Sequence, residues 1–244
     1  MKIGITGARG FIGTHIASRL REKSGASIAE CSRPVCNMLD AQDVAQFVRG
    51  EDVIIHAAAV NRGTDAEVIA GTIVSVYNLI SAASKQKKKP KIIFLSSIQA
   101  ETETIYGQAK RLAEAMLEEY SKRYRASVSI LRIANVFGEG CRPFYNSVVA
   151  TFCYQLARRE VITVNPNNKK FNFVYVGDLV DEIMKELFAT RARPFSFKRV
   201  TSKNELTIPA LAILLKKISI SGGKGLKNSF EKKLYATYKS YTTQ

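Results

Sequence analysis

The sequence is poor in the residues that bind transition metals or build disulfide frameworks. It has no tryptophan, two histidines and four cysteines among 244 residues. The cysteines are Cys31, Cys36, Cys141 and Cys153; they lack the Cys-x-x-Cys spacing of zinc sites, and neither histidine is near them in the sequence. We therefore expect no metal centre and four reduced, mostly buried thiols.

Long apolar runs are also missing. No run approaches the ~20 apolar residues that are needed to cross a bilayer. The first residues, Met1-Lys2-Ile3-Gly4-Ile5, lead directly into a strand pattern and not into a charged leader with an apolar segment behind it. The hydrophobic fraction is 46% and the mean hydropathy is -0.07, which are ordinary values for a globular protein. We expect a cytoplasmic protein with no membrane span.

Acidic residues are scarce relative to basic ones. The chain has 21 Asp and Glu against 37 Lys and Arg, a net charge of +16. This balance makes nucleic acid a candidate partner. However, the densest cluster, Lys85 to Lys91, lies between an expected helix and an expected strand, where a solvated turn is the commoner explanation. An anionic cofactor and an anionic nucleotide substrate would use the same positive field, so nucleic-acid binding is the less favoured interpretation.

Short apolar runs alternate with amphipathic helical patterns through the first two thirds of the chain. The expected strands are at residues 2–6, 27–31, 52–57, 91–96 and 127–133. The expected helices are at residues 11–21, 41–48, 67–85 and 106–123. This alternation predicts an α/β fold, a Rossmann-type doubly wound parallel sheet whose strands are buried between two helical layers.

After Gly138 the alternation becomes less regular. The expected later elements are a helix at 144–157, a strand at 171–176, a helix at 177–188, a strand at 196–201 and a helix from about Thr207. We expect residues 1–188 to form an NAD(P)-binding Rossmann domain, with 138–170 contributing part of the substrate site. Residues 189–244 are then expected to form a small C-terminal lobe, which binds substrate, and a basic tail.

A glycine-rich loop, Gly7-Ala8-Arg9-Gly10-Phe11-Ile12-Gly13, lies between the first expected strand and the first expected helix. In this position the spacing is typical of dinucleotide binding, because the glycines allow a tight turn, room for the pyrophosphate and close helix–strand packing. Free amides at the helix start would face the phosphates. We expect the cofactor to contact Gly7, Arg9, Gly10, Phe11, Ile12 and Gly13.

The end of the second expected strand bears on the choice of nicotinamide cofactor. An acid there usually binds the ribose 2′-hydroxyl of NAD, whereas a cation accommodates the 2′-phosphate of NADP. Arg33 lies just beyond this strand and Arg9 lies in the glycine loop, which favours NADP. Glu30 keeps NAD as the alternative. Both arginines have an ordinary explanation as solvated loop or turn residues.

Two further segments are expected to line the cofactor. Asn37 or Asp40 would bond the exocyclic nitrogen of the adenine, although both are equally explained as turn and helix-cap residues. After the third expected strand, Ala57 and Ala58 offer small side chains where a flat cofactor must pass. His56 is expected to be a packed strand-end residue and takes no part in the predicted chemistry.

Tyr106 and Lys110 form a Tyr-x-x-x-Lys pair, and Ser97 precedes them at a strand end. A ketone accepts hydride only as its oxygen gains a proton, which a tyrosine with the reference pKa of ~10 supplies poorly. A lysine one helical turn away lies on the same face and lowers that pKa. The serine hydroxyl would polarise the same oxygen. The alternative is a surface pair on a helix, but the glycine loop upstream favours the catalytic interpretation, with Ser97, Tyr106 and Lys110 as catalytic residues.

These motifs resemble those of the extended short-chain dehydrogenase/reductases, the NAD-dependent epimerase/dehydratase family. The resemblance covers at least residues 1–188 and includes Leu131-Arg132-Ile133-Ala134-Asn135-Val136-Phe137-Gly138 and Phe173-Val174-Tyr175-Val176-Gly177-Asp178. It implies that Asn135 contacts the phosphates of a nucleotide sugar and that Asp178 orders the substrate lobe. It also implies that the expected helices at 67–85 and 106–123 pair across a two-fold axis in a homodimer.

A narrower resemblance is to the reductase domain of CapF/WbjC-type capsular polysaccharide UDP-sugar reductases. It lies in Ser96-Ser97-Ile98-Gln99-Ala100, in residues 140–154 and in the segment Lys232 to Tyr238. It implies NADPH-dependent reduction of the 4-keto group of a UDP-2-acetamido-2,6-dideoxyhexulose, in a pathway of the UDP-N-acetyl-L-fucosamine type. Those enzymes continue into a C-terminal cupin epimerase that this chain lacks, so a separate cupin chain is a possible partner.

Arg142, Tyr145 and Asn146 are our candidates for binding the uridine diphosphate or the sugar, since an arginine fork suits phosphate oxygens. The alternative is a cap and packing cluster at the start of the expected helix at 144–157. Ile98 and Gln99 stand where a sugar dehydratase has an Asp-Glu pair, which argues against dehydration. A nucleotide-sugar 4-epimerase and a non-catalytic NADP-binding protein stay open as alternatives.

Overall fold

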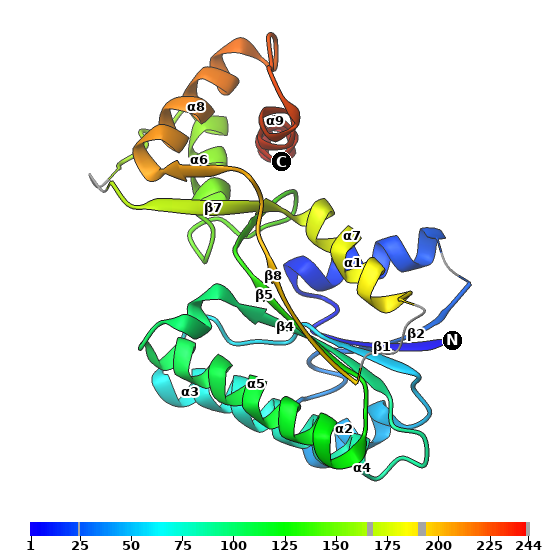
Figure 1. Ribbon diagram of the computed structural model, residues 1–244. Helices are drawn as coiled ribbons and strands as arrows, with labels where there is room; N and C mark the ends of the chain where they lie inside the picture. The colour runs from blue at the N-terminus through cyan, green and yellow to red at the C-terminus, as the bar shows by residue number, and fades with distance from the viewer. Residues whose placement is uncertain (24, 165–167, 190–193, 243–244) are drawn as a thin grey trace. The chain divides into compact units, whose positions relative to one another are not determined.

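The computed structural model describes residues 1–23, 25–164, 168–189 and 194–242. The chain forms two compact units, and each is built from two chain segments (Figure 1). The first unit comprises Met1–Ile133 and Val180–Val200, and the second comprises Ala134–Leu179 and Thr201–Gln244. A single domain boundary was expected after residue 188. In the structure, the chain passes from one unit to the other after Ile133, after Leu179 and after Val200.

Six parallel strands form the sheet of the first unit, in the order β2-β1-β3-β4-β5-β8. Their bounds are β1 Lys2–Thr6, β2 Ser27–Cys31, β3 Val53–His56, β4 Lys91–Ser97, β5 Val128–Ile133 and β8 Phe195–Val200. Strands β2 and β3 lie on opposite sides of β1. The strand order therefore reverses between β1 and β3, which is the switch point where open α/β sheets bind ligands. The predicted Rossmann-type parallel sheet is confirmed.

Helices cover both faces of this sheet, as Figure 1 shows, with α2, α3, α4 and α5 on one face and α1 on the other. The bounds are α1 Phe11–Lys23, α2 Ala41–Val48, α3 Asp65–Ile69, the π-helical turn η1 Ala70–Val74, α4 Ser75–Ser84, the 3-10 turn η2 Ile98–Glu101, α5 Ile105–Tyr124 and α7 Val176–Leu187. Side-chain caps fix several of the helix starts. Thr104 accepts a hydrogen bond from the Gly107 amide at the start of α5, and Thr64 with Glu67 forms a capping box on α3.

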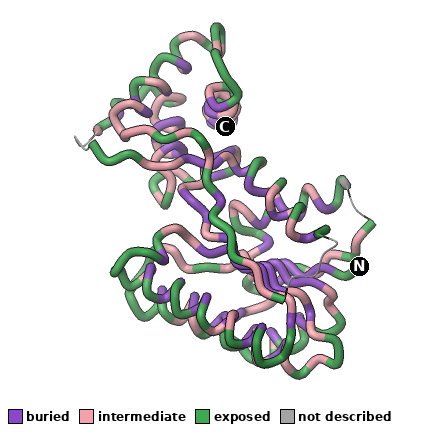
Figure 2. Tube along the Cα trace, in the orientation of Figure 1, coloured by how far each residue is buried: buried purple, intermediate pink, exposed green. Residues whose placement is uncertain are grey.

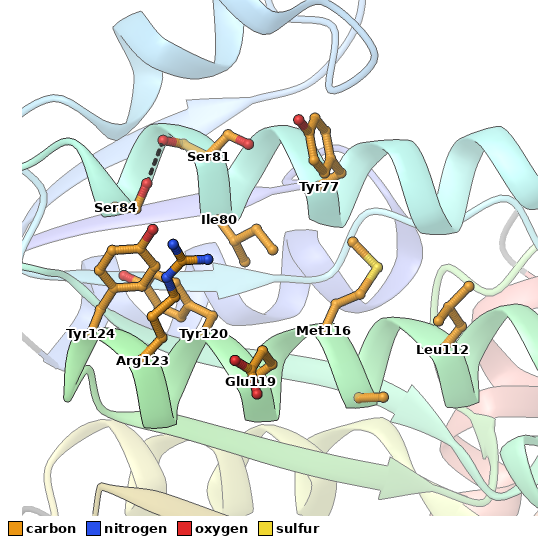
Figure 3. A pocket seen from close by; sticks show the side chains of 11 residues that line it. Tyr77, Ile80, Ser81, Ser84, Leu112, Met116, Glu119, Tyr120, Arg123 and Tyr124 are labelled. Atoms are coloured by element: carbon orange, nitrogen blue, oxygen red, sulfur yellow. Dashed lines mark hydrogen bonds between the residues drawn. The ribbon is translucent and has the colours of Figure 1, made fainter.

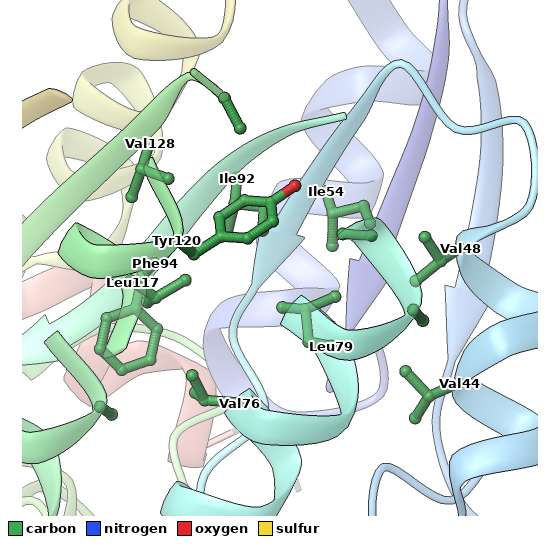
Figure 4. Close-up of a cluster of buried hydrophobic side chains, with 14 of the residues drawn as sticks. Val44, Val48, Ile54, Val76, Leu79, Ile92, Phe94, Leu117, Tyr120 and Val128 are labelled. Atoms are coloured by element: carbon green, nitrogen blue, oxygen red, sulfur yellow. The ribbon is translucent and has the colours of Figure 1, made fainter. Parts of the chain in front are cut away.

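The core of the first unit lies between the sheet and helices α2, α4 and α5 (Figures 2 and 4). Each of these helices contributes aliphatic side chains that contact buried strand residues. The labelled members in Figure 4 are Val44, Val48, Ile54, Val76, Leu79, Ile92, Phe94, Leu117, Tyr120 and Val128. This burial fixes the rotation of α5 about its axis, and therefore which side chains of α5 face the sheet.

The stretch Asp65–Ser84 is long and apolar enough to cross a membrane by length and composition, with a mean hydropathy of 1.5. This corrects the expectation that no run approaches that length. In the fold, however, 44% of the window is buried. The apolar character of the stretch follows in part from its packing against α2 and α5, which makes it weak support for a membrane span.

In its described residues, the second unit contains a three-stranded sheet in the order β6-β7-β9, three complete helices and the first residues of α7. Strands β6 and β7 are parallel, whereas β7 and β9 are antiparallel. The bounds are β6 Asn135–Phe137, β7 Lys170–Tyr175, β9 Glu205–Thr207, α6 Val148–Ala157, α8 Ile208–Ser221 and α9 Ser229–Thr242. The expected basic tail is thus helical in α9, where Leu234 and Tyr241 are buried.

Candidate functional site

The glycine loop turns from β1 into α1 with little space between them. Gly7 has a φ of +67°, and its amide donates to the Cys31 carbonyl at 2.8 Å. A Cβ placed on Gly13 would lie 2.1 Å from the Gly7 carbonyl oxygen, so only glycine allows helix and turn to come this close. The first turn of α1 holds no acidic residue, and the first amides of a helix lack intrahelical acceptors and suit an anion. This cradle fits a dinucleotide pyrophosphate.

The end of β2 is closed by a disulfide between Cys31 and Cys36, with a Cα–Cα distance of 4.9 Å. The expectation of four reduced thiols was wrong for this pair, because the turn after β2 brings Cys36 back onto the strand end. It holds for Cys141 and Cys153, which are free and buried. Burial raises the pKa of the Cys141 thiol to about 11.

Next to the disulfide, the Ser32 hydroxyl accepts a hydrogen bond from the Arg9 amide at 3.2 Å. This bond ties the glycine loop to the segment that carries Arg33, so the two arginines predicted to meet a 2′-phosphate lie on connected loops. Glu30, the residue that kept NAD as the alternative, forms an ion pair with Arg21 of α1.

Asn37 and Asp40 both have local structural roles. The Asn37 side chain accepts from the Leu39 amide at 3.1 Å, and Asp40 caps α2 by accepting from the amides of Gln42 and Asp43. The turn-and-cap alternative therefore describes Asp40. Asn37 has a local partner as well, and its contact with adenine stays a prediction.

Behind the loop after β3, a buried polar group supports the backbone of Ala58. The Ala58 amide donates to the Thr6 hydroxyl at 3.1 Å, and that hydroxyl lies 2.8 Å from Nδ1 of His56. Burial, and secondarily the charge of Lys110, lowers the pKa of His56 to about 3. The imidazole is therefore neutral near pH 7 and acts as packing, stacked on Phe94.

Ser97, Tyr106 and Lys110 belong to one continuous piece of the first unit. Ser97 ends β4 and caps η2 by accepting from the Gln99 amide at 3.1 Å. A Cβ on Gly107 would lie 2.3 Å from the Gln99 carbonyl oxygen, so η2 packs directly against the first turn of α5, which carries Tyr106. This packing limits how far the Ser97 strand end can lie from the tyrosine.

Lys110 is fully buried in this piece. Its Nζ donates to the Leu95 carbonyl at 3.1 Å and lies 4.8 Å from the ring centroid of Phe94 and 5.8 Å from that of Tyr106. Burial lowers the pKa of Lys110 to about 8, with Glu114 opposing the shift. A solvated surface pair would not show this burial of the lysine, whereas the catalytic role of Tyr106 and Lys110 stays a prediction.

Sequence reasoning missed the charged partners around this piece. Glu114 lies one turn beyond Lys110, and its carboxylate is bound by Arg132 of β5 at 2.6 Å and by the Ser96 hydroxyl. Glu101, the last residue of η2, accepts from Arg132 at 3.0 Å. The available signal for Glu114 was its spacing, because Tyr106, Lys110 and Glu114 are polar residues at every fourth position and share one helix face.

The candidate substrate residues all lie in the second unit. Asn135 is held by a hydrogen bond from its side chain to the Asn172 carbonyl at 3.1 Å, and the Arg142 guanidinium lies 5.5 Å from the ring centroid of Tyr145. Arg142 and Asn146 are exposed, and Tyr145 is half-buried. The expected helix at 144–157 begins only at Val148, so these residues belong to the loop before α6 and not to a helix start.

Residues near the end of the chain support this unit. Lys233 of α9 donates to both carboxylate oxygens of Asp178 at 2.7 Å, and the Tyr241 hydroxyl donates to the Cys141 carbonyl in the loop before α6. Asp178 therefore connects α9 with the start of α7. This contact agrees with an ordering role for Asp178 within its own unit.

The doubly wound sheet has a glycine cradle at its switch point, a serine at the end of β4 and a buried lysine beside a tyrosine on α5. These features define a dinucleotide-binding protein of the reductase and epimerase class. The model of the NAD dependent epimerase/dehydratase family matches residues 3–192. The chain belongs to this family.

Several relatives are similar over nearly the whole chain. UDP-2-acetamido-2,6-beta-L-arabino-hexul-4-ose reductase of Pseudomonas aeruginosa is 31% identical, over 99% of this chain and 65% of the relative. The crystal structure of the capsular polysaccharide assembling protein CapF from Staphylococcus aureus superposes with a TM-score of 0.84 at 34% identity, over 99% of this chain and 65% of that chain. UDP-glucuronic acid 4-epimerase from Bacillus cereus, solved with NAD, gives 0.86 at 21% identity, over 100% of this chain and 97% of that chain, and shows the fold alone.

The chain therefore spans 65% of the length of the first two relatives. It matches them from its first residues to near its last, and the remaining third of each relative has no counterpart in the sequence given.

Proposed function

We propose that the chain is an NADPH-dependent nucleotide-sugar reductase that reduces the 4-keto group of a UDP-2-acetamido-2,6-dideoxyhexulose in polysaccharide biosynthesis. The observation that carries the proposal is the buried Lys110 beside Tyr106, packed against the strand end that carries Ser97. The similarity to the Pseudomonas reductase over 99% of the chain supports the substrate class.

In the proposed reaction the bound nicotinamide supplies the hydride. Tyr106 donates the proton that the carbonyl oxygen takes up, and the Lys110 ammonium stabilises the phenolate that remains. The Ser97 hydroxyl donates a hydrogen bond to the same oxygen as negative charge develops on it. Burial excludes water from Lys110, which strengthens its electrostatic effect on the tyrosine.

The residues present fit a dinucleotide. The Gly7–Gly13 cradle and the amides of the first turn of α1 would hold the pyrophosphate, and Ala57 and Ala58 would face the nicotinamide side. We assign NADP as the cofactor because Arg9 and Arg33 lie on loops joined through Ser32. NAD stays the alternative. In fluorescence titration, Arg9→Ala should weaken NADPH binding about tenfold, as expected for one lost charged hydrogen bond, and leave NADH binding unchanged.

We assign substrate binding to Asn135, Arg142, Tyr145 and Asn146. The exposed Arg142 guanidinium near the Tyr145 ring offers a planar fork for phosphate oxygens. The fixed amide of Asn135 offers a hydrogen-bonding group of defined direction.

The experiment that tests the function combines the purified chain, NADPH and a UDP-4-keto-6-deoxy-N-acetylhexosamine. Consumption of the reduced-cofactor absorbance, with formation of one reduced sugar per NADPH, is expected. The absence of consumption while NADPH still binds would overturn the reductase proposal and would favour a non-catalytic NADP-binding protein.

Three other functions make different predictions. A 4-epimerase would be purified with tightly bound nicotinamide and would interconvert sugars with no net consumption of cofactor. Sugar dehydration needs a free acid and base after Ser97, but Glu101 is bound by Arg132 and Glu103 by Arg111. Nucleic-acid binding through the basic surface predicts a steep dependence of affinity on salt, measurable with a short duplex.

For assembly we propose a homodimer through α4 and α5. These helices line a groove of 560 Å³, shown in Figure 3, in which Tyr77 is 59% exposed and Leu112 is 49% exposed. A face with such large exposed apolar side chains is typical of a protein interface. A separate cupin epimerase as a partner is a further part of this proposal and rests on the narrower resemblance. A cytoplasmic location is also proposed, and it rests on the sequence expectations given above.

A further inference from the structure

One face of α5 carries three polar side chains at intervals of one helical turn: Tyr106, Lys110 and Glu114. Lys110 and Glu114 are buried, and Tyr106 is half-buried. Tyr106 and Lys110 have roles in the proposed reaction. Glu114 has none so far, although a buried carboxylate is retained only where its partners compensate for its lost hydration.

The partners of Glu114 come from two neighbouring strands. Ser96 of β4 donates its hydroxyl to Glu114, and Arg132 of β5 binds both carboxylate oxygens, with Nε at 3.0 and 3.1 Å and a second nitrogen at 2.6 Å. Ser96 directly precedes Ser97. The carboxylate therefore holds α5 to the end of the strand that carries the proposed serine.

The same arginine reaches the segment that follows Ser97. Arg132 donates through its remaining nitrogen to Glu101 at 3.0 Å, and Glu101 also accepts from Arg199 of β8. Glu101 is the last residue of η2, the turn that Ser97 caps. Both sides of Ser97 are thus fixed to Arg132, upstream through Ser96 and Glu114 and downstream through Glu101.

We infer that Glu114, clamped by Arg132, is a positioning residue of the reaction centre: it holds the Ser97 strand end against α5 and supplies the negative charge that keeps a proton on the Tyr106–Lys110 pair. The inference rests on the proposed function, because the proton it retains is the one delivered to the ketone.

The other described groups that face Lys110 carry no charge that would help it to keep its proton. From β4 the lysine is faced by the Leu95 carbonyl and the Phe94 ring. From β3 it is faced by His56, which burial keeps neutral. Glu114 is the charged residue that acts on the lysine in the favourable direction, against the desolvation that favours loss of its proton.

The test is Glu114→Gln, which keeps the size of the side chain but removes its charge and replaces one accepting oxygen with a donating amide nitrogen. Loss of the negative charge makes proton loss from the Tyr106–Lys110 pair easier. The alkaline limb of kcat for NADPH-dependent ketone reduction should therefore move to lower pH by about one unit. KM for NADPH should be unchanged, because the partners that hold Glu114, Ser96 and Arg132, belong to β4 and β5 and not to the glycine loop.

The matched control is Glu118→Gln, one turn further along α5, where the carboxylate pairs with exposed Lys122. It should leave the alkaline limb in place. Glu114→Asp keeps the charge and should restore the limb to its wild-type position, even where kcat falls. If Glu114→Gln does not fold, Arg132→Lys keeps both charges but loses the bidentate clamp, and should lower kcat without moving the limb.

A second readout needs no substrate. The tyrosine absorbance titration of each protein, minus that of its Tyr106→Phe derivative, isolates the ionisation of Tyr106. A wild-type enzyme without keto-sugar turnover would sink the proposed function while this titration still tests Glu114. If Glu114→Gln lowers only thermal stability and moves neither the alkaline limb nor the titration, Glu114 is merely structural and the inference is wrong.

Discussion

The two faces of helix α5 differ in almost every respect. The inner face, defined by Tyr106, Lys110, Glu114 and Leu117, faces the sheet and combines buried charges with the apolar core. The outer face, defined by Leu112, Met116, Glu119 and Arg123, lines an open groove with α4. One helix thus carries the proposed proton donor on one side and the proposed subunit contact on the other.

This contrast shows that the buried charges of α5 lie on its inner face, although burying a charge costs free energy. Charges on the inner face have specific partners on β4 and β5, whereas the outer face places apolar side chains next to solvent. A fold that required only stability would favour the reverse distribution. The inverted pattern is what a catalytic face and an interface on one helix would produce.

The largest expected effect is on catalysis at the inner face. Tyr106→Phe removes the proposed proton donor, and kcat for keto-sugar reduction should fall by about 10² to 10⁴. NADPH binding, followed by fluorescence, should persist. Tyr124→Phe, at the C-terminal end of the same helix in the groove, should leave kcat unchanged. Equal turnover by Tyr106→Phe and wild type would show that the inner face of α5 does not supply the proton donor.

The two faces of α5 should also differ in how much their side chains contribute to the free energy of unfolding. Leu117 is fully buried, and Leu117→Ala should lower the free energy of unfolding by about 2–5 kcal/mol, because it leaves a cavity beneath α5. Leu112 is 49% exposed, and Leu112→Ala should change it by about 0.5 kcal/mol or less. Urea unfolding at equal protein concentration measures both. Similar losses for the two variants would mean that the outer face is covered in solution.

The sequence predicted the first unit well, because its strands and helices are long enough to show their periods. Five predicted strands are each within two residues of their observed bounds, and the helix expected at 106–123 is observed as Ile105–Tyr124. The glycine loop was also predictable. The geometry of this loop is a local strand–turn–helix arrangement, which is determined by residues that are consecutive in the sequence.

The second unit was predicted less well, for physical reasons. Strands β6 and β9 have three residues each, too few for a period to show. The helix at 148–157 begins later than expected because Phe144 adopts a left-handed φ of 56° and Ser147 caps the helix instead. The helix at the end of the chain was read as a basic tail, since its lysines obscured the burial of Leu234 and Tyr241.

Contacts between specific pairs of side chains were also not predicted from the sequence. The Glu114–Arg132 clamp joins residues on α5 and β5, and nothing in either local pattern specifies the partner. That contact becomes visible only once the sheet order is known. The Cys31–Cys36 disulfide joins residues only five positions apart, but it depends on a turn that the spacing alone did not indicate.

The pH dependence of stability tests whether Lys110 is as buried as the inner face requires. Its pKa is lowered from 10.5 to about 8, so between these values the unfolded chain binds more protons than the folded one. Stability should therefore rise with pH across this window, by up to about 3 kcal/mol from this group. The difference in unfolding free energy between wild type and Lys110→Met, measured from pH 7 to 11, isolates the effect. A flat difference would indicate a solvated lysine.

The smallest effect concerns the outer face alone. If α4 and α5 form the proposed dimer, Met116→Glu places a carboxylate among apolar side chains of the groove, and its desolvation should raise the dimer dissociation constant at least about tenfold. Lys217→Glu, on the exposed side of α8, places a carboxylate outside the groove, with a larger change of net charge, and should leave the dimer intact. Light scattering at micromolar concentration distinguishes these outcomes. A wild-type monomer, or a dimer that both variants leave unchanged, would assign the groove no role in assembly and restrict the function of α5 to its inner face.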